Sequence, residues 1–217
     1  MKTILVLVVQ LTMLTDAWSQ GFVNLNFEQG YGVGESIPGW TAYKDNTTTT
    51  VLLNNISLSG GAICLLGANF GTIEGNYYAY LQGSGINAGI DTAGIGQTGT
   101  IPLGTQSLIF WGNVGMNDVS FNGQNLALPL LGSNPNYNIY GTDISSYAGQ
   151  TGQLLFTSYS SQVGGQWDSV DNIQFSATPV PEPNSLGLFA LGGLIVAWRQ
   201  WRKSSPKVSP NSSPVER

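Results

Sequence analysis

The chain has 217 residues, of which 29 are glycine and only 9% are charged; it contains no histidine and a single cysteine. This length allows one domain with a hydrophobic core. Residues 21–178 hold nine acidic residues and one base, Lys44, whereas five of the seven bases follow Trp198. So acidic a body excludes nucleic acid as a partner, because binding phosphates requires clustered Lys and Arg. The lack of histidine removes the usual triad base and imidazole metal ligands.

Residues 1–19 are predicted to be a signal peptide. Lys2 gives a positive start, residues 4–14 are mostly apolar, and Ala17 and Ser19 are the small residues that signal peptidase requires. We expect cleavage before Gln20 and export of the rest. A lone cysteine is unusual in an exported protein, because oxidising compartments favour paired cysteines. Since Cys64 lies in the apolar run AICLL, it is predicted to be an inert core residue.

Residues 20–178 are predicted to form an all-β body. Short apolar or aromatic runs recur between Gly, Asn, Asp and Ser, and no run has helical periodicity. The expected strands are residues 22–28, 48–53, 62–66, 77–82, 106–112, 125–131, 137–141, 153–159 and 172–176. Residues 142–150 are expected to add a single helical turn. Many short strands favour a β-sandwich over a parallel α/β sheet; a β-helix is the competing architecture, although no repeat period supports it.

The chain ends with an unusual combination of features. A stiff segment, Val180-Pro181-Glu182-Pro183, precedes thirteen uncharged residues (186–198), and the bases Arg199, Arg202 and Lys203 follow. Thirteen residues make a helix of about 20 Å, which is short for a hydrocarbon core of about 30 Å. A transmembrane helix over 185–201 is therefore expected only if Arg199 snorkels to the interface. The basic cluster, 199–203, would then lie in the cytoplasm, with the body outside.

This order of features resembles the PEP-CTERM sorting signal of Gram-negative bacteria, over residues 179–203. The resemblance implies an exported precursor that is anchored in the inner membrane and recognised by an exosortase, a membrane-embedded cysteine protease-transpeptidase. It also implies a final place at the cell surface or in an extracellular matrix, with exopolysaccharide as a further partner. Residues 204–217 depart from the pattern and are expected to be a disordered cytoplasmic tail. An ordinary stop-transfer anchor is the alternative.

The body carries a second resemblance. VNLNFE, IPGW, YYAYLQG, GIGQTGTIPLGTQSLIFWGN and WDSVDNIQF occur in the order seen in the galactose-binding-like jelly-roll sandwich, which several carbohydrate-binding modules share. In that family, the Glu that ends the first motif and the Asp that opens the last often bind a structural calcium. The matching residues are Glu28 and Asp171. Calcium prefers oxygen ligands, so the resemblance implies this ion as the one possible cofactor. Two exposed acids at strand ends are the alternative.

The functional prediction is a non-enzymatic exported protein. Residues 94–99 spell the dinucleotide fingerprint GxGxxG, but Pro102 and the β-rich residues that follow forbid the required helix. No motif selects the carboxylate pair that a glycosidase needs, which leaves a hydrolase as the remote alternative. The main alternative is a carbohydrate-binding lectin, with candidate aromatic residues in expected loops. These are Tyr31, Trp40, Tyr137 and Trp167.

Overall fold

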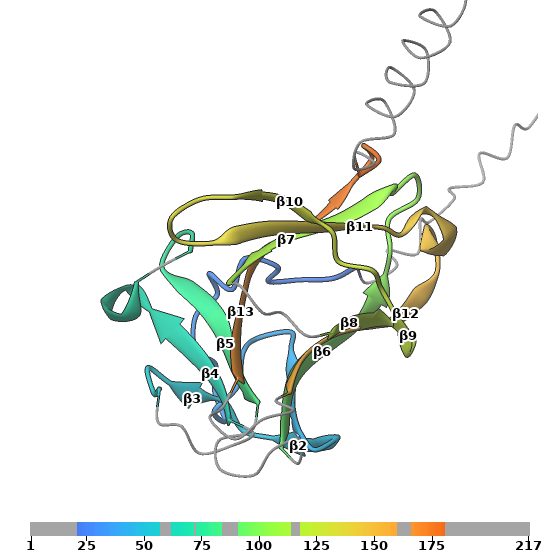
Figure 1. Ribbon diagram of the computed structural model, residues 1–217. Coiled ribbons are helices and arrows are strands. Elements are labelled where there is room, and N and C mark those ends of the chain that lie inside the picture. Colours follow the sequence, from blue (N-terminus) through green and yellow to red (C-terminus); the bar gives the residue numbers. More distant parts are fainter. Residues whose placement is uncertain are drawn as a thin grey trace, which may run out of the picture. The chain divides into compact units, whose positions relative to one another are not determined.

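The computed structural model describes residues 21–56, 62–71, 73–83, 91–113, 118–159 and 166–180. Within these ranges, thirteen strands form two sheets that face each other (Figure 1). The prediction of a β-sandwich is confirmed, and the competing β-helix is wrong. The predicted signal peptide, residues 1–19, the C-terminal helix, 185–201, and the tail, 204–217, lie outside the described residues.

One sheet has six strands in the order β2-β1-β6-β12-β8-β9. These strands are β1 (Thr41–Lys44), β2 (Thr47–Thr49), β6 (Thr92–Thr100), β8 (Asp118–Phe121), β9 (Gln124–Asn125) and β12 (Thr151–Tyr159). The other sheet has seven strands in the order β10-β11-β7-β13-β5-β4-β3. These are β3 (Leu52–Leu53), β4 (Ala62–Gly67), β5 (Tyr77–Gly83), β7 (Ser107–Gly112), β10 (Leu130–Ser133), β11 (Asn138–Asp143) and β13 (Gln166–Ser176).

The strands pair antiparallel throughout the described ranges, except for the parallel pair β3–β4. Two 3-10 turns interrupt them, η1 (Ala68–Phe70) and η2 (Ser145–Tyr147). The second confirms the helical turn expected within residues 142–150.

The main core lies between the sheets and is rich in phenylalanine. Phe27, Phe110, Phe121 and Phe156 are fully buried there, and the rings of Phe110 and Phe156 meet edge to face, 5.2 Å apart. In β12, burial alternates with a period of two residues, so one face of the strand packs on this core while the other faces outward. Side chains on the outer face of β12 therefore do not contribute to the core between the sheets.

Strand β4 is buried on both faces. Ile63 and Leu65 belong to the main core, whereas Cys64 and Leu66 pack with Tyr78 in a second, smaller cluster. This double burial explains the unbroken apolar run that was seen in the sequence. Cys64 is 0% exposed. Burial raises the pKa of its thiol to about 11 despite a hydrogen bond from Gln82. The predicted core position of Cys64 is confirmed, and its inertness stays a prediction.

The first predicted strand, residues 22–28, is wrong. The segment instead makes consecutive turns, with positive φ angles of 50° at Asn24 and 57° at Phe27. The side chain of Asn24 holds the turns by accepting a hydrogen bond from the backbone of Gln29 and donating one to the carbonyl of Pro38. Asn tolerates this left-handed conformation, and full burial keeps Phe27 in it. Glu28 therefore lies on a turn and not at the end of a strand.

Candidate functional site

Two carboxylates, one near the start and one near the end of the body's sequence, bind the segment that leads into β5. The side chain of Glu28 accepts hydrogen bonds from the backbone nitrogens of Asn76 and Tyr77, at 2.7 and 2.9 Å, and from the side-chain amide of Asn76 at 2.9 Å. Asp171, on β13, accepts one from the backbone nitrogen of Glu74 at 3.0 Å. We call Glu28, Asp171 and the segment Glu74–Tyr77 the carboxylate clasp.

The two acids of the clasp differ in their electrostatic surroundings. Asp171 is 0% exposed. Burial raises the pKa of its carboxyl to about 7, the charges of Glu74 and Glu28 add to the rise, and the backbone hydrogen bonds from Asn172 and Glu74 oppose it. At Glu28, partial burial raises the pKa, but the bonds from Asn76 and Tyr77 outweigh it and lower the value overall. The surroundings of Glu28 thus favour its ionised form, whereas those of Asp171 favour its protonated form and bring its pKa close to neutral pH.

The clasp borders an acidic hollow of about 250 Å³, lined by Asn26, Glu28, Glu74, Gly75 and Asn172. Oxygen donors of this kind suit a hard cation such as calcium. However, all four carboxylate oxygens of Glu28 and Asp171 already accept hydrogen bonds, from backbone nitrogens and from the side-chain amide of Asn76. Moreover, within the described part of the chain no three His, Cys, Asp or Glu residues gather closely enough to hold a metal ion. Glu28 and Asp171 thus bond to the same segment, and calcium binding by them stays a prediction.

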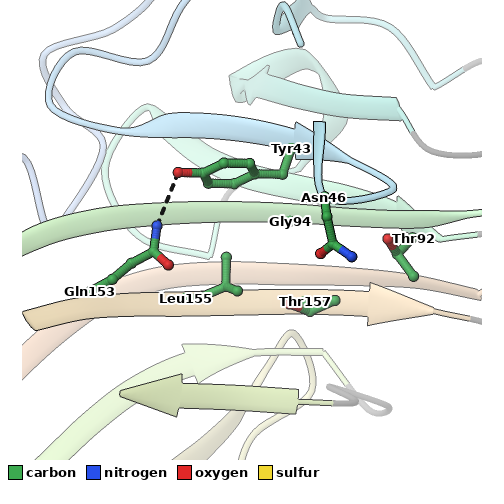
Figure 2. A pocket seen from close by; sticks show the side chains of 7 residues that line it. All are labelled: Tyr43, Asn46, Thr92, Gly94, Gln153, Leu155 and Thr157. Carbon is green, nitrogen blue, oxygen red and sulfur yellow. Dashed lines mark hydrogen bonds between the residues drawn. The ribbon is translucent and has the colours of Figure 1, made fainter. Parts of the chain in front are cut away.

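A second hollow of about 240 Å³ lies on the outer face of the six-stranded sheet (Figure 2). We call it the trough. It crosses three neighbouring strands: Tyr43 comes from β1, Gly94 from β6 and Leu155 from β12. The full lining is Tyr43, Asn46, Thr92, Gly94, Gln153, Leu155 and Thr157.

Missing side chains on β6 create the trough. Tyr43 pairs with Gly94 across the sheet, and Gly94 pairs with Thr157, so the glycine lies between two side chains that rise from the flanking strands. At Gly96, two residues along the same face, a Cβ atom would meet Tyr43, Leu155 and Gln153 at 3.1 to 3.2 Å. The side-chain amide of Gln153 donates a hydrogen bond of 2.9 Å to the hydroxyl of Tyr43 (Figure 2), and the ring of Tyr43 lies against Gly96.

The aromatic residues predicted from the sequence lie elsewhere. Trp40 is 6% exposed and packs in the core, so its placement in a binding loop is wrong. Tyr31 packs against the same core and donates its hydroxyl to the carbonyl of Val51. Tyr137 stacks on Trp111 with ring centroids 4.5 Å apart.

Of the four predicted aromatic residues, Trp167 alone is largely exposed, at 42%. Sequence reasoning missed Tyr43, the aromatic residue of the trough. The signal that could have found it was the glycine pair Gly94 and Gly96, once residues 92–100 were taken as a strand instead of as a failed dinucleotide loop.

The described part of the chain ends at Val180, and hydrogen bonds still hold Thr178 to the body. The hydroxyl of Ser107 donates to the carbonyl of Thr178 at 2.7 Å, and the backbone of Thr178 donates to the hydroxyl of Ser176 at 3.0 Å. The predicted sorting residues Pro181, Glu182 and Pro183 and the basic cluster Arg199, Arg202 and Lys203 lie outside the described residues. Within the described ranges, no helix has the length and apolar character needed to cross a membrane.

Two solved structures are distantly similar to the chain. The enzymatically active domain of tailspike protein 4 from bacteriophage CBA120 is 19% identical, with a TM-score of 0.38 over 69% of this chain and 21% of that one. The chain thus spans about a fifth of that domain's length. TmCBM61, solved in complex with β-1,4-galactotriose, is 17% identical, with a TM-score of 0.36 over 71% of this chain and 97% of that one. No curated protein matches the chain.

Residues 179–203 match the model of the PEP-CTERM protein-sorting motif. The match has the same bounds as the segment singled out in the sequence and includes the Val180–Pro183 tetrapeptide and the basic residues up to Lys203. The chain therefore carries a PEP-CTERM protein-sorting motif directly after its β-sandwich.

Proposed function

We propose that this protein is a non-enzymatic surface protein that is exported, held briefly in the inner membrane and released to the cell surface or extracellular matrix by an exosortase. The PEP-CTERM motif over residues 179–203 is the observation that carries this proposal. In this scheme the signal peptide, residues 1–19, directs export, and the helix over 185–201 retains the precursor. The basic residues Arg199, Arg202 and Lys203 stop translocation.

The sorting tetrapeptide would act through its stiffness. Proline fixes φ near −65° and biases the preceding residue towards an extended conformation, so Val180 and Glu182 are both restrained. Under this proposal the two prolines would present Glu182 on an extended segment, a shape that a protease can recognise. The body still makes a hydrogen bond at Thr178, two residues before the tetrapeptide begins, so the tetrapeptide follows the folded part almost at once.

The test replaces Pro181, Glu182 and Pro183 together by Ala in a host that contains an exosortase. Export and membrane insertion should persist while processing stops, which the mass of the product measures. Pro206→Ala with Pro210→Ala in the tail is the matched control and should be processed normally. Equal processing of the triple variant and the natural chain would contradict the proposal, and loss of insertion would mean that motif and helix have other roles. A host without the exosortase should accumulate the uncut, membrane-bound form.

A second candidate function is carbohydrate binding by the body, as a lectin-like module. The observation that favours it is the trough, which places hydroxyl and amide groups around an aromatic ring on the outer face of a sheet. Small-molecule sites commonly combine an apolar wall with a few convergent polar groups in this way. Sorting and sugar binding are compatible, since a surface protein that binds a matrix glycan would use both.

A further inference from the structure

The trough offers hydrogen-bonding groups without charge. Asn46 and Gln153 contribute side-chain amides, Thr92 and Thr157 contribute hydroxyls, and no Asp, Glu, Lys or Arg is among the described residues that line the trough. A hydroxyl or amide both donates and accepts hydrogen bonds, which matches the hydroxyl groups of a sugar. The body around the trough has nine acids and one base, so an anionic ligand would be repelled.

The apolar part of the trough has the shape that a sugar ring needs. The aromatic ring of Tyr43 forms one side, and Leu155 rises from β12 on the other (Figure 2). A pyranose has an apolar face of C–H groups and a rim of hydroxyls, so it can pack against Tyr43 while its rim meets the polar side chains. At about 240 Å³, the trough is smaller than the roughly 300–1,000 Å³ of drug-sized pockets. It therefore fits a short stretch of a glycan.

A peptide strand does not suit this surface. The three strands under the trough each have a hydrogen-bonded neighbour on both sides, since β1 lies between β2 and β6, and β12 lies between β6 and β8. Their backbone groups are consumed by the sheet, so an added strand finds no free edge there. Recognition at the trough must use side chains alone.

We propose that the trough binds a neutral glycan, with one sugar ring packed on Tyr43 and hydrogen-bonded by Gln153 and Thr157. The proposal rests on the second candidate function above and names its ligand class and place. The hydroxyl of Tyr43 accepts its hydrogen bond from Gln153, which leaves its own proton available for a sugar oxygen.

The test measures binding of the full-length chain, purified in detergent, to neutral hexose and pentose oligosaccharides and to matched uronic acid oligosaccharides. Thr157→Trp fills the trough and should weaken neutral binding at least tenfold. Tyr43→Phe keeps the ring but loses one hydroxyl and should weaken it about two- to tenfold. Thr151→Trp is the control, because Thr151 is exposed on the same face of β12, beyond the trough. Melting curves check that every variant is folded.

Loss of neutral binding in Thr157→Trp, with retention in Thr151→Trp, supports the proposal. Neutral binding that survives Thr157→Trp and Tyr43→Phe overturns the trough as its site and leaves carbohydrate binding elsewhere on the body intact. Preference for the uronic acid oligosaccharides overturns the assignment of a neutral ligand. Absence of binding to every glycan overturns both the trough and the second candidate function. The sorting proposal is tested separately by exosortase processing, so none of these binding results bears on it.

Discussion

The hollow beside the carboxylate clasp and the trough have nearly equal sizes, about 250 and 240 Å³, but they are built in opposite ways. The clasp is acidic and joins a turn, a loop and strand β13, which are distant in sequence, and its carboxylates accept hydrogen bonds mainly from backbone amides. The trough is uncharged, lies on the outer face of three paired strands and presents only side chains. The difference indicates separate roles, since the clasp ties the fold together whereas the trough has groups left for a ligand.

The largest effect should come from removing the buried acid of the clasp. Asp171→Ala leaves the backbone nitrogens of Glu74 and Asn172 without their carboxylate partner. These two hydrogen bonds are partly buried, and their loss together with the cavity left by the fully buried carboxyl group should lower the free energy of unfolding by about 2–5 kcal/mol in urea denaturation at pH 5. Asp143→Ala is the control: its exposed carboxylate also accepts a backbone hydrogen bond, from Ser145, and its loss should cost at most about 1 kcal/mol. Equal costs would mean that the clasp is no more structural than a surface turn.

The next effect is on the pH dependence of stability. The pKa of Asp171 is raised to about 7 from 3.8, so the folded state holds this proton more tightly than the unfolded state. Stability from this group is complete below about pH 3.8 and declines as the pH rises towards 7, by up to about 4 kcal/mol. The lowered pKa of Glu28 acts at lower pH and in the opposite direction. Unfolding free energies between pH 5 and 7.5 should therefore fall in the natural chain but not in Asp171→Asn.

The same titration tests the calcium prediction. A cation bound between Glu28 and Asp171 would compensate their charge, so millimolar calcium should flatten the decline at neutral pH, and a chelator should restore it. Identical curves in calcium and in chelator would show that the clasp works without the ion. A calcium effect that persists in Asp171→Asn would place the ion elsewhere.

A smaller effect separates backbone strain from crowding within the clasp. Gly75 has a φ of +58°, and a Cβ atom there would overlap the carboxylate of Glu28. Gly34 has a φ of +75° with open space around it. Gly34→Ala should cost about 1 kcal/mol through its left-handed backbone alone. Gly75→Ala should cost about 1 kcal/mol more, as measured by urea denaturation. If the two variants are equally stable, Glu28 moves aside freely and its hold on the segment is weak.

Strands that bury several apolar side chains could be predicted from the apolar runs in the sequence. Strands β4, β5, β7, β11, β12 and β13 each overlap an expected run. Strand β6 was missed because TAGIGQTGT has few apolar side chains, and its pairing with β1 and β12 supplies what the local sequence lacks. The error at residues 22–28 has the reverse cause. Their apolar alternation imitates a strand, but the side chain of Asn24 bonds to the backbone and turns the chain.

Site residues were predictable only where a motif fixes them in sequence. The sorting segment could be recognised because its parts are contiguous. Glu28 and Asp171 could be paired only through a resemblance, because no local signal links residues so far apart. Trp40 was placed in a loop because Gly and Pro precede it, yet its ring is large enough to be drawn into the core, where its indole nitrogen donates to the carbonyl of Asn24.

The hydrogen bond from Ser107 to Thr178 limits rotational freedom at the end of the body. β13 ends at Ser176, so only four residues precede Pro181, and a fully extended tetrapeptide reaches at most about 14 Å. Thr178 is fixed in the middle of that short distance. The body therefore keeps hold of its own chain as far as Thr178, three residues before Pro181.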